Sequence, residues 1–417
     1  MNRLSLLAFC AIVLLATFHV QGKHDSHYKS SQSKKVMGYY PAYNYKVQSP
    51  SQIPWSLYTD LTFFVAIPNL DGSFTYPPGL TSENAAKLAK EFVTLANSNK
   101  VLPAITYGGW TGSRYFSTMA KNKTNRKKYA KILIDFAKKF GFKGIDIDWE
   151  YPNGAGIGCN TFDKMDTVNL GLFLQEIRKQ WPKAQLSSAL GISGLVGASG
   201  SAATTEETKL VVKHLDFVKI MAYDVFGNWA ATTGPIAPLY ATCAPESPIS
   251  VETAFQALVE QGFKPEKMVL GLPAYARSYE LTSSKLAPRN VDGKVSLYYQ
   301  NHTSVAPRGG KTDDRPMKDV CGVQTDWGGL WLVKEFTEKG YLSKDLLKGG
   351  NGYKRYFDKC SSTPFLTNGK YFFSYDDQVS VVAKAKYAKS KKLSGIYFFD
   401  TQGLPDFAVK AGRDALH

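Results

Sequence analysis

The sequence predicts a (β/α)8 TIM barrel, a closed ring of parallel strands surrounded by helices, with a small α+β insertion between the seventh and eighth strands. Three observations lead to this fold class. Eight short apolar runs alternate with helical patterns along the chain, as in a parallel barrel. The alternative, a doubly wound open sheet, has no glycine-rich phosphate loop to support it. One interval between runs, residues 274–394, is long enough to contain an inserted subdomain.

The eight candidate strands are short runs of apolar, β-branched or aromatic residues. In chain order they cover residues 36–40, 61–67, 101–106, 144–149, 186–190, 217–222, 268–272 and 395–399. In a barrel of this kind the active site lies at the C-terminal ends of the strands. We therefore look for functional residues where these runs end.

Helical patterns lie between the runs. Apolar residues three or four positions apart predict a helix over 129–140 that ends at Gly141, and another over 170–181 that ends before Pro182. Residues 279–371 are rich in glycine, lysine and aromatic residues and form the predicted insertion. Residues 371–393 then read as the lead-in to the final barrel helix and the helix itself.

The N-terminus indicates export. Residues 1–22 combine Arg3, an apolar run and small residues near Gly22, a pattern that is typical of a secretory signal peptide and too short for a membrane anchor. A basic, polar leader follows over 23–35, so the barrel occupies 36–417. Because no other stretch is long enough to span a bilayer, we expect a secreted, extracellular protein with no membrane partner.

Loss of the signal peptide leaves four cysteines. An even number in an exported chain indicates two disulfide bonds, and no CxxC pair suggests zinc or redox chemistry. The residues by themselves leave three pairings open among Cys159, Cys243, Cys321 and Cys360. Asn122 and Asn301 begin N-x-T sequons and are candidate glycosylation sites.

Composition places the chain among globular proteins, with 44% hydrophobic and 21% charged residues. The net charge of +16 suits either a nucleic-acid partner or a solvated basic surface. The lysines of the chain are scattered over predicted helix faces and are not clustered with aromatic residues in a nucleic-acid-binding motif. We therefore expect no nucleic-acid partner, a surface attracted to acidic cell-wall material, and a monomer.

The stretch "GIDIDWEYP", residues 144–152, places three carboxylates at alternate positions of a strand: Asp146, Asp148 and Glu150. Alternate side chains point the same way, so in a barrel we expect all three to point inward, about 6.6 Å apart. Glu150 comes last, at the catalytic mouth. Its acidic neighbours raise its pKa, which suits a general acid, and the lower pair can share a proton.

Four motifs resemble those of family 18 glycoside hydrolases, the retaining chitinases, and the resemblance covers nearly the whole mature chain. "KGIDIDWEYP" resembles the DGxDxDxE signature, "AITYGGW" (104–110) the SxGG strand, "MAYD" (221–224) the MxYD strand and "GLPAYARSY" (271–279) the strand-seven motif. The spacing of the cysteines resembles secreted fungal members. That likeness implies the pairs Cys159–Cys243 and Cys321–Cys360.

The resemblance implies hydrolysis of β-1,4 linkages in chitin and chito-oligosaccharides with retention, an exception to the usual two-carboxylate scheme. Glu150 would protonate the glycosidic oxygen while the substrate's acetamido oxygen attacks the anomeric carbon, giving an oxazolinium ion. Asp148 would hold the acetamido N–H and share a proton with Asp146, and Tyr223 would bond the acetamido oxygen. No metal or cofactor is needed.

The resemblance also implies a set of substrate-binding residues around the motifs. Tyr39 and Thr106 would support the lower carboxylate, and aromatic side chains would stack on sugar rings. The expected set is Tyr39, Thr106, Gly109, Trp110, Trp149, Tyr151, Met221, Asp224, Tyr275, Arg277 and Phe399, with Trp229 as a further aromatic candidate.

The chain departs from the family pattern at three positions. Lys143 replaces the first Asp of the signature, Val65 stands where the family often has Phe, and Phe399 replaces a Trp that floors the subsite of the cleaved sugar. Phe offers less stacking area and no N–H, and a pairing of Lys143 with Asp146 would disturb proton sharing. These changes support a rival function: a catalytically impaired chitinase-like lectin that sequesters chitin oligosaccharides as an immune-masking effector.

Overall fold

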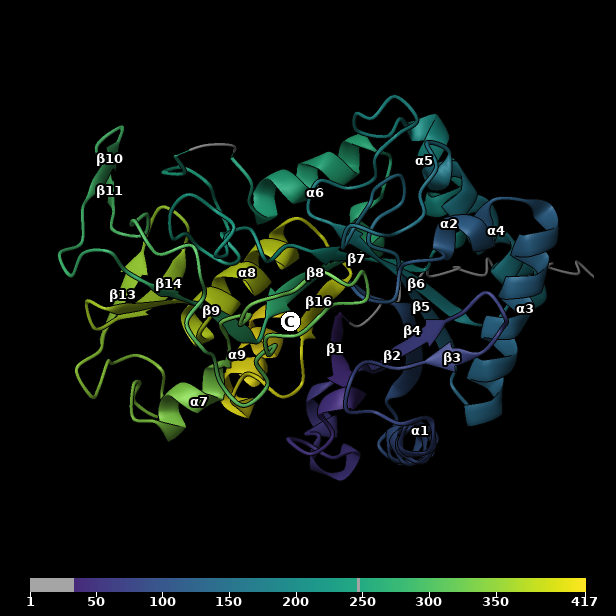
Figure 1. Cartoon of the computed structure of the whole chain (residues 1–417), viewed down its shortest axis with the longest axis horizontal. Coiled ribbons are helices and arrows are strands. Elements are labelled where there is room, and N and C mark those ends of the chain that lie inside the picture. Colours follow the sequence, from purple (N-terminus) through teal and green to yellow (C-terminus); the bar gives the residue numbers. More distant parts are fainter. Residues whose placement is uncertain (1–33, 246–247) are drawn as a thin grey trace, which may run out of the picture. The chain divides into compact units, whose positions relative to one another are not determined.

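The computed structural model describes residues 34–245 and 248–417, and within them eight parallel strands close into a barrel (Figure 1). The barrel strands are β1 (Lys35–Pro41), β2 (Asp60–Pro68), β4 (Leu102–Gly108), β5 (Gly144–Asp148), β6 (Gln185–Gly191), β7 (Phe217–Met221), β8 (Met268–Pro273) and β16 (Gly395–Phe399). Strand β1 pairs with both β2 and β16, which closes the ring. The predicted (β/α)8 barrel is confirmed, and each predicted run coincides with one barrel strand.

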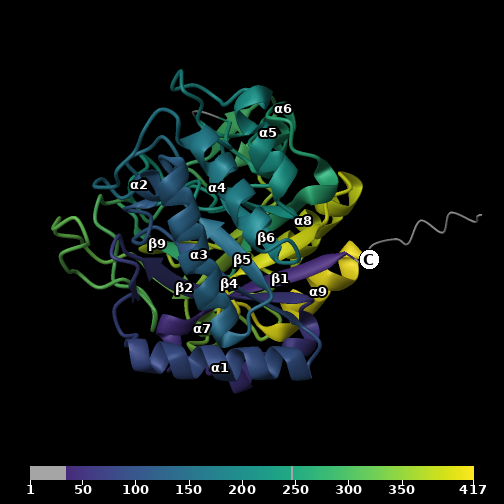
Figure 2. The same ribbon diagram turned by 90° about the vertical axis from the view of Figure 1, so that its right-hand side faces the viewer.

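Helices cover the outside of the barrel (Figure 2). They are α1 (Ser82–Ser98), α2 (Phe116–Ala120), α3 (Lys123–Phe140), α4 (Asp166–Gln180), α5 (Thr205–His214), α6 (Val251–Glu260), α8 (Gln378–Ser390) and α9 (Asp406–Leu416). Helix α3 ends where the sequence predicts, because Gly141 takes a left-handed backbone with φ of 84°, which glycine adopts without strain. Its first residue follows Asn122, whose exposed side chain caps the helix by accepting from the Asn125 amide.

Between β8 and β16 the chain forms a second, antiparallel sheet in the order β12-β9-β15-β14-β13 (Figure 1). Its strands are β9 (Tyr275–Glu280), β12 (Leu330–Leu332), β13 (Lys354–Asp358), β14 (Thr363–Thr367) and β15 (Tyr371–Ser374), accompanied by helix α7 (Val333–Glu338) and the hairpin β10 (Arg289–Val291) and β11 (Lys294–Ser296). A short strand, β3 (Phe74–Thr75), pairs with the end of β2. The second sheet extends a few residues beyond each end of the interval 279–371.

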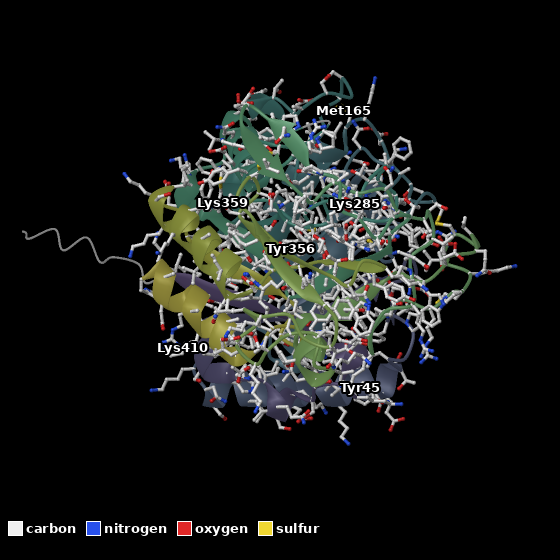
Figure 3. All side chains as sticks on the ribbon, turned by 90° about the vertical axis from the view of Figure 1, so that its left-hand side faces the viewer. Tyr45, Met165, Lys285, Tyr356, Lys359 and Lys410 are labelled. Carbon is white, nitrogen blue, oxygen red and sulfur yellow. A yellow bond between two sulfur atoms is a disulfide. The ribbon has the colours of Figure 1, made fainter. Side chains whose placement is uncertain are left out.

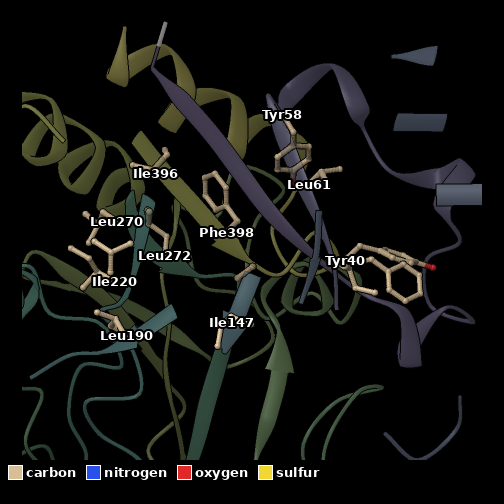
Figure 4. Close-up of a cluster of buried hydrophobic side chains, with 14 of the residues drawn as sticks. Tyr40, Tyr58, Leu61, Ile147, Leu190, Ile220, Leu270, Leu272, Ile396 and Phe398 are labelled. Carbon is tan, nitrogen blue, oxygen red and sulfur yellow. The ribbon is translucent and has the colours of Figure 1, made fainter. Parts of the chain in front are cut away.

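The main core lies between the barrel and its helices (Figure 4). Outward-facing barrel residues such as Ile147, Leu190, Ile220, Leu270 and Phe398 are fully buried there. Burial of each such side chain contributes about 1.5–3 kcal/mol. Because side chains alternate along a strand, the neighbours of these apolar residues point into the barrel, where the polar side chains of the site gather.

Two disulfides join barrel loops to the inserted region, and the pairing expected from the resemblance is wrong. Cys159 bonds Cys321, and Cys243 bonds Cys360, each with Cα atoms 5.6 Å apart. The inserted region folds back over the loops that follow β5 and β7, so each loop meets a distant part of the chain rather than its neighbour. For example, the Leu239 amide donates to the Ser361 carbonyl at 2.8 Å.

The remaining predictions about export concern the ends and surface of the chain. The signal peptide and all but the last two residues of the basic leader lie outside the described residues. In the part that is described, no helix is long and apolar enough to cross a membrane. Asn122 and Asn301 are both exposed, as glycosylation would require, and their modification stays a prediction.

Candidate active site

Strand β5 positions the three carboxylates that the sequence singled out. Asp146 and Asp148 lie on the strand and point into the barrel, where both are buried, and Glu150 follows two residues beyond its end and is half-buried. The carboxylates therefore form a ladder that rises from the barrel interior to its mouth. Ile145 and Ile147, at the alternate positions, belong to the outer core, so burying them on that side directs the carboxylates inward.

Asp146 is the most enclosed of the three and is surrounded by donors. Its Oδ2 accepts from the Tyr39 hydroxyl at 2.8 Å and from the Thr106 hydroxyl at 3.0 Å. Its Oδ1 accepts from the Ser187 hydroxyl and forms an ion pair with Lys219 Nζ at 3.1 Å. Tyr39 and Thr106 thus hold the lower carboxylate in the way that the resemblance implies. Ser187 and Lys219 were not predicted.

Lys219 is an unexpected cation inside the barrel. It lies on the inner face of β7, is only 1% exposed, donates to the Thr62 hydroxyl at 3.0 Å, and lies 4.3 Å from the centre of the Tyr39 ring. The sequence did offer a signal: lysine breaks the apolar run "FVKIMA" at an inward-facing position two residues before Met221. A buried lysine requires a carboxylate partner, and only the fold shows that Asp146 is that partner.

Asp148 is buried with one oxygen unpaired. Its Oδ1 is inaccessible to solvent and, among the described residues, has no hydrogen-bond partner. Burial raises the pKa of Asp148 well above its usual range, and the nearby Glu150 and Asp146 raise it further, while Lys219 opposes them. An unsatisfied buried acceptor is costly, and this oxygen can accept an N–H without giving up another hydrogen bond.

Glu150 has the protonation behaviour of a general acid. Burial raises its pKa to about 7, with a further rise from the negative charge of Asp224 and a partial offset from Tyr151. Its backbone is held in place, because its amide donates to the Ser113 hydroxyl at 2.8 Å and its carbonyl accepts from the Asn160 side chain at 2.8 Å. A carboxyl that keeps its proton near neutral pH can donate it to a leaving group.

Two glycines allow β4 to approach β5 beside Asp148. Gly108 and Gly109 have φ values of 109° and 81°, and a Cβ on Gly108 would lie 2.1 Å from the Asp148 carbonyl oxygen. The Gly109 amide donates to that same carbonyl at 2.8 Å. Gly109, predicted as a substrate-binding residue, here supports the backbone of Asp148.

Tyr223 shares a hydroxyl network with a residue that the sequence did not single out. The Tyr223 and Tyr397 hydroxyls are 3.1 Å apart, and Tyr397 donates to the Ile220 carbonyl at 3.1 Å. Each hydroxyl has one proton, so Tyr223 donates to Tyr397 in this arrangement. The Tyr223 proton is therefore engaged by Tyr397 in this structure.

Phe399 forms part of an aromatic floor. Its ring is half-buried, stacks on Tyr223 with centroids 6.0 Å apart, and makes edge contacts with Tyr39, Phe64 and Tyr275. Tyr151 is half-buried beside Glu150 and Asp148, and Met221 is half-buried at the end of β7. The position of Phe399 therefore retains an aromatic face, with a smaller area than an indole would offer.

Asp224 organises the rim on the side of the second sheet. Its Oδ2 accepts from the Tyr275 hydroxyl at 2.7 Å and its Oδ1 from Arg277 Nε at 2.5 Å. The Arg277 guanidinium also lies 4.6 Å from the centre of the Trp229 ring, a cation–π contact. Arg277, expected to bind substrate, thus pairs with a carboxylate at the rim, and its contact with a sugar stays a prediction.

The predicted tryptophan platforms divide into exposed and buried residues. Trp110, after β4, and Trp229 are 49% and 63% exposed, and one face of the Trp229 ring is already covered by the Arg277 guanidinium. Trp149 is 1% exposed and stacks on Phe116 at 5.5 Å, so its assignment as a sugar platform is wrong. The reason is strand parity: Asp146 and Asp148 point inward, which directs Trp149 outward into the core beneath α2.

Lys143 does not pair with Asp146, whose partners among the described residues are Tyr39, Thr106, Ser187 and Lys219. The pairing that would disturb proton sharing is therefore not formed. The residue is exposed just before β5, and its amide donates to the Pro103 carbonyl at 2.8 Å. It belongs to the end of the barrel opposite the mouth, where residues serve stability rather than catalysis. The cation beside Asp146 is Lys219.

Two cavities lie away from this site. One of about 530 Å³ is lined by residues of the second sheet, among them Tyr356 and Lys359, which Figure 3 labels on that side of the molecule. The other, of about 560 Å³, is lined by residues of α3 and α4, including Arg126 and Leu172. Neither is lined by a predicted catalytic or substrate-binding residue, so the carboxylate ladder remains the candidate active site.

Comparisons with known proteins agree with this geometry. The model of glycosyl hydrolases family 18 matches residues 35–403. A chitinase-like effector of Moniliophthora roreri is 36% identical to this chain, and the match covers 90% of this chain and 91% of that protein. A chitinase-like effector of Moniliophthora perniciosa is 35% identical, and the match covers 90% of this chain and 85% of that protein. The crystal structure of a chitinase from Rhizomucor miehei matches with a TM-score of 0.78 and 25% identity, covering 92% of this chain and all of that one. The chain therefore belongs to glycosyl hydrolases family 18.

Proposed function

We propose that the protein is an exported chitinase that hydrolyses β-1,4 linkages between N-acetylglucosamine units by a retaining, substrate-assisted mechanism. One observation carries the proposal: the unpaired, buried oxygen of Asp148 lies on the same carboxylate ladder as Glu150, whose pKa is about 7. An acetamido group supplies the N–H that Asp148 lacks and the internal nucleophile that replaces a second carboxylate. Sugars without this group have neither.

The reaction follows from the roles of these two carboxyl groups. Glu150 donates its proton to the glycosidic oxygen as the bond to the anomeric carbon breaks. The acetamido oxygen attacks that carbon, and the resulting oxazolinium cation is stabilised by Asp148, which accepts the acetamido N–H. Glu150, now a carboxylate, takes a proton from water, and the water opens the ring with retention of configuration. Tyr223 donates to the acetamido oxygen once it releases Tyr397.

Export is supported by two observations. Two disulfides occur in the described part of the chain, and disulfides persist in oxidising compartments. Residues 1–22 have the pattern of a signal peptide. A soluble chito-oligosaccharide or accessible chitin outside the cell is the proposed substrate, bound by one copy of the chain.

A second candidate function is sequestration of chitin oligosaccharides without efficient cleavage. The Moniliophthora relatives are named chitinase-like effectors, and Phe399 provides a smaller stacking surface than tryptophan at the floor of the site. Both functions require the same binding site. They differ in whether Glu150 completes the proton transfer.

Mass spectrometry of chitohexaose incubated with the secreted protein distinguishes the two functions. We expect short products from the natural chain, and also from Lys143→Asp because Lys143 lies far from the site. With Glu150→Gln we expect the hexamer to stay intact. Titration calorimetry on the same samples measures binding. Intact hexamer together with clear binding by the natural chain would instead establish the sequestering lectin, and an absence of binding would overturn both functions.

A further inference from the structure

The strongest unexplained feature of the site is the buried lysine beneath it. Lys219 contacts three barrel strands: it forms an ion pair with Asp146 of β5, donates to Thr62 of β2, and lies over the ring of Tyr39 of β1. Both members of the ion pair are almost completely buried, at 1% and 0% side-chain exposure. A charge in such a place interacts strongly with every neighbouring carboxyl, yet none of the steps proposed above uses it.

The partners of Asp146 determine its protonation state. A carboxylate has room for about four hydrogen bonds, and Asp146 has contacts with Tyr39, Thr106, Ser187 and Lys219. Each of the three hydroxyl groups can rotate and accept a hydrogen bond from a neutral carboxyl group. An ammonium group can only donate a hydrogen bond. Lys219 is therefore the contact that commits Asp146 to its ionised form.

The other charged and titratable groups around Lys219 leave Asp146 as its counter-ion. Asp60, lower on β2, is paired with Lys35 at 3.2 Å and accepts from the Gln185 side chain at 2.7 Å. Asp148 lies above on β5, and the Tyr39, Tyr223 and Tyr397 hydroxyls complete the surroundings. Burial raises the pKa of all three tyrosines well above the usual range, and the carboxylates of the ladder raise it further for Tyr39 and Tyr397, so all three hydroxyls stay neutral.

We propose that Lys219 is a positioning residue that fixes Asp146 as a carboxylate. The protons that bind to the carboxylate ladder are then held by Asp148 and Glu150, and not by Asp146. This inference rests on the proposed function, in which Asp148 receives the acetamido N–H. Asp146 then serves as a permanent counter-ion rather than as a store for a shared proton. On this proposal Asp146 does not share a proton with Asp148, in contrast to the expectation from the sequence.

The charge of Lys219 has a consequence for Asp148. The lysine opposes the rise in the pKa of Asp148 that burial, Glu150 and Asp146 produce, because a nearby cation favours the ionised acid. Ionised Asp148 accepts an acetamido N–H more strongly than the neutral acid does. Removing the lysine charge is therefore expected to raise the pKa of Asp148 and to restrict tight binding to higher pH.

The test measures binding in the Glu150→Gln background, where hydrolysis does not interfere. Chitohexaose affinity is titrated by calorimetry between pH 4 and pH 8, with and without Lys219→Gln, which keeps a donor for Thr62 but removes the charge. We expect the acid-side midpoint of binding to move to higher pH, with affinity on the acid side falling about tenfold for each pH unit of displacement. Lys219→Arg, which restores the charge, should return the midpoint.

A matched control is available in the same barrel. Lys384 on α8 forms a fully buried ion pair with Asp376 away from the carboxylate ladder. Lys384→Gln should lower the melting temperature and leave the midpoint of binding unchanged. If Lys219→Gln also lowers only the melting temperature, Lys219 is a structural residue and the proposal is overturned.

A ligand-free measurement keeps the proposal independent of the proposed function. Infrared difference spectra of the free Glu150→Gln protein follow the carboxyl band that appears on acidification. We expect part of this band to disappear in Asp148→Asn and to shift to higher pH in Lys219→Gln. A component that survives Asp148→Asn and disappears in Asp146→Asn would show that Asp146 takes up the proton, and would overturn the proposal even if chitohexaose did not bind.

Discussion

Raising the pH through 7 is expected to switch off hydrolysis, because burial raises the pKa of Glu150 to about 7 from an ordinary 4.5. At pH 7 about half of the molecules then have the protonated general acid, whereas a carboxyl with the ordinary value would be protonated in only about 0.3% of them. The structure therefore increases the acid form about 150-fold at neutral pH. Above pH 8 the rate should fall about tenfold for each further unit.

The assay is kcat/KM for a chromogenic chito-oligosaccharide between pH 4 and pH 9, since this parameter reports the ionisation of the free enzyme. Asp224→Asn provides an internal test: the charge of Asp224 raises the pKa of Glu150, so its removal should move the basic limb to lower pH. Glu150→Gln should abolish turnover at every pH. A basic limb centred near pH 5 in the natural chain would refute the argument, because Glu150 would then behave as a solvated carboxyl.

The remaining predictions concern stacking, packing and covalent links. Trp110→Ala should weaken chitohexaose binding roughly tenfold by calorimetry, because an exposed indole face is lost. Trp149→Phe should leave the affinity unchanged and lower stability by about 1–2 kcal/mol in denaturant titrations. A larger loss of affinity in Trp149→Phe than in Trp110→Ala would contradict the burial of these two residues. Phe399→Trp should tighten binding through the larger aromatic surface, and weaker binding would indicate that the aromatic floor has no room for an indole. Non-reduced peptide mapping should link Cys159 to Cys321, and replacing both by serine should cost about 2–4 kcal/mol of stability; a peptide that links Cys159 to another cysteine would contradict the fold of the inserted region.

The position of the carboxylate ladder could be predicted from residues 144–152 alone. A strand has a fixed alternation, so the spacing of Asp146, Asp148 and Glu150 already placed their side chains on one face. The same rule, applied to Trp149, should have directed this residue away from the sugar. Proximity to a motif does not bring a side chain into the site when its strand parity directs it to the opposite face.

The electrostatics of the site depended on contacts between strands far apart in the sequence. Lys143 precedes Asp146 by three positions, but an extended chain separates them by about 10 Å and the residue turns to solvent. Lys219 is 73 positions after Asp146 in the sequence, yet the barrel brings its ammonium group to 3.1 Å from that carboxylate. Closure of a ring of strands creates such neighbours, and local sequence patterns contain no record of them.

The sequence by itself determined the barrel, its eight strands and the ladder of acids, because these follow from local alternation of apolar and polar residues and from short motifs. Only the tertiary structure decided the disulfide partners, the unpaired oxygen of Asp148 and the cation beneath it. Each of these depends on which segments meet when the barrel closes and the inserted region folds back over its loops. Distances between such segments are set by the packing of the whole chain, and local spacing does not encode them.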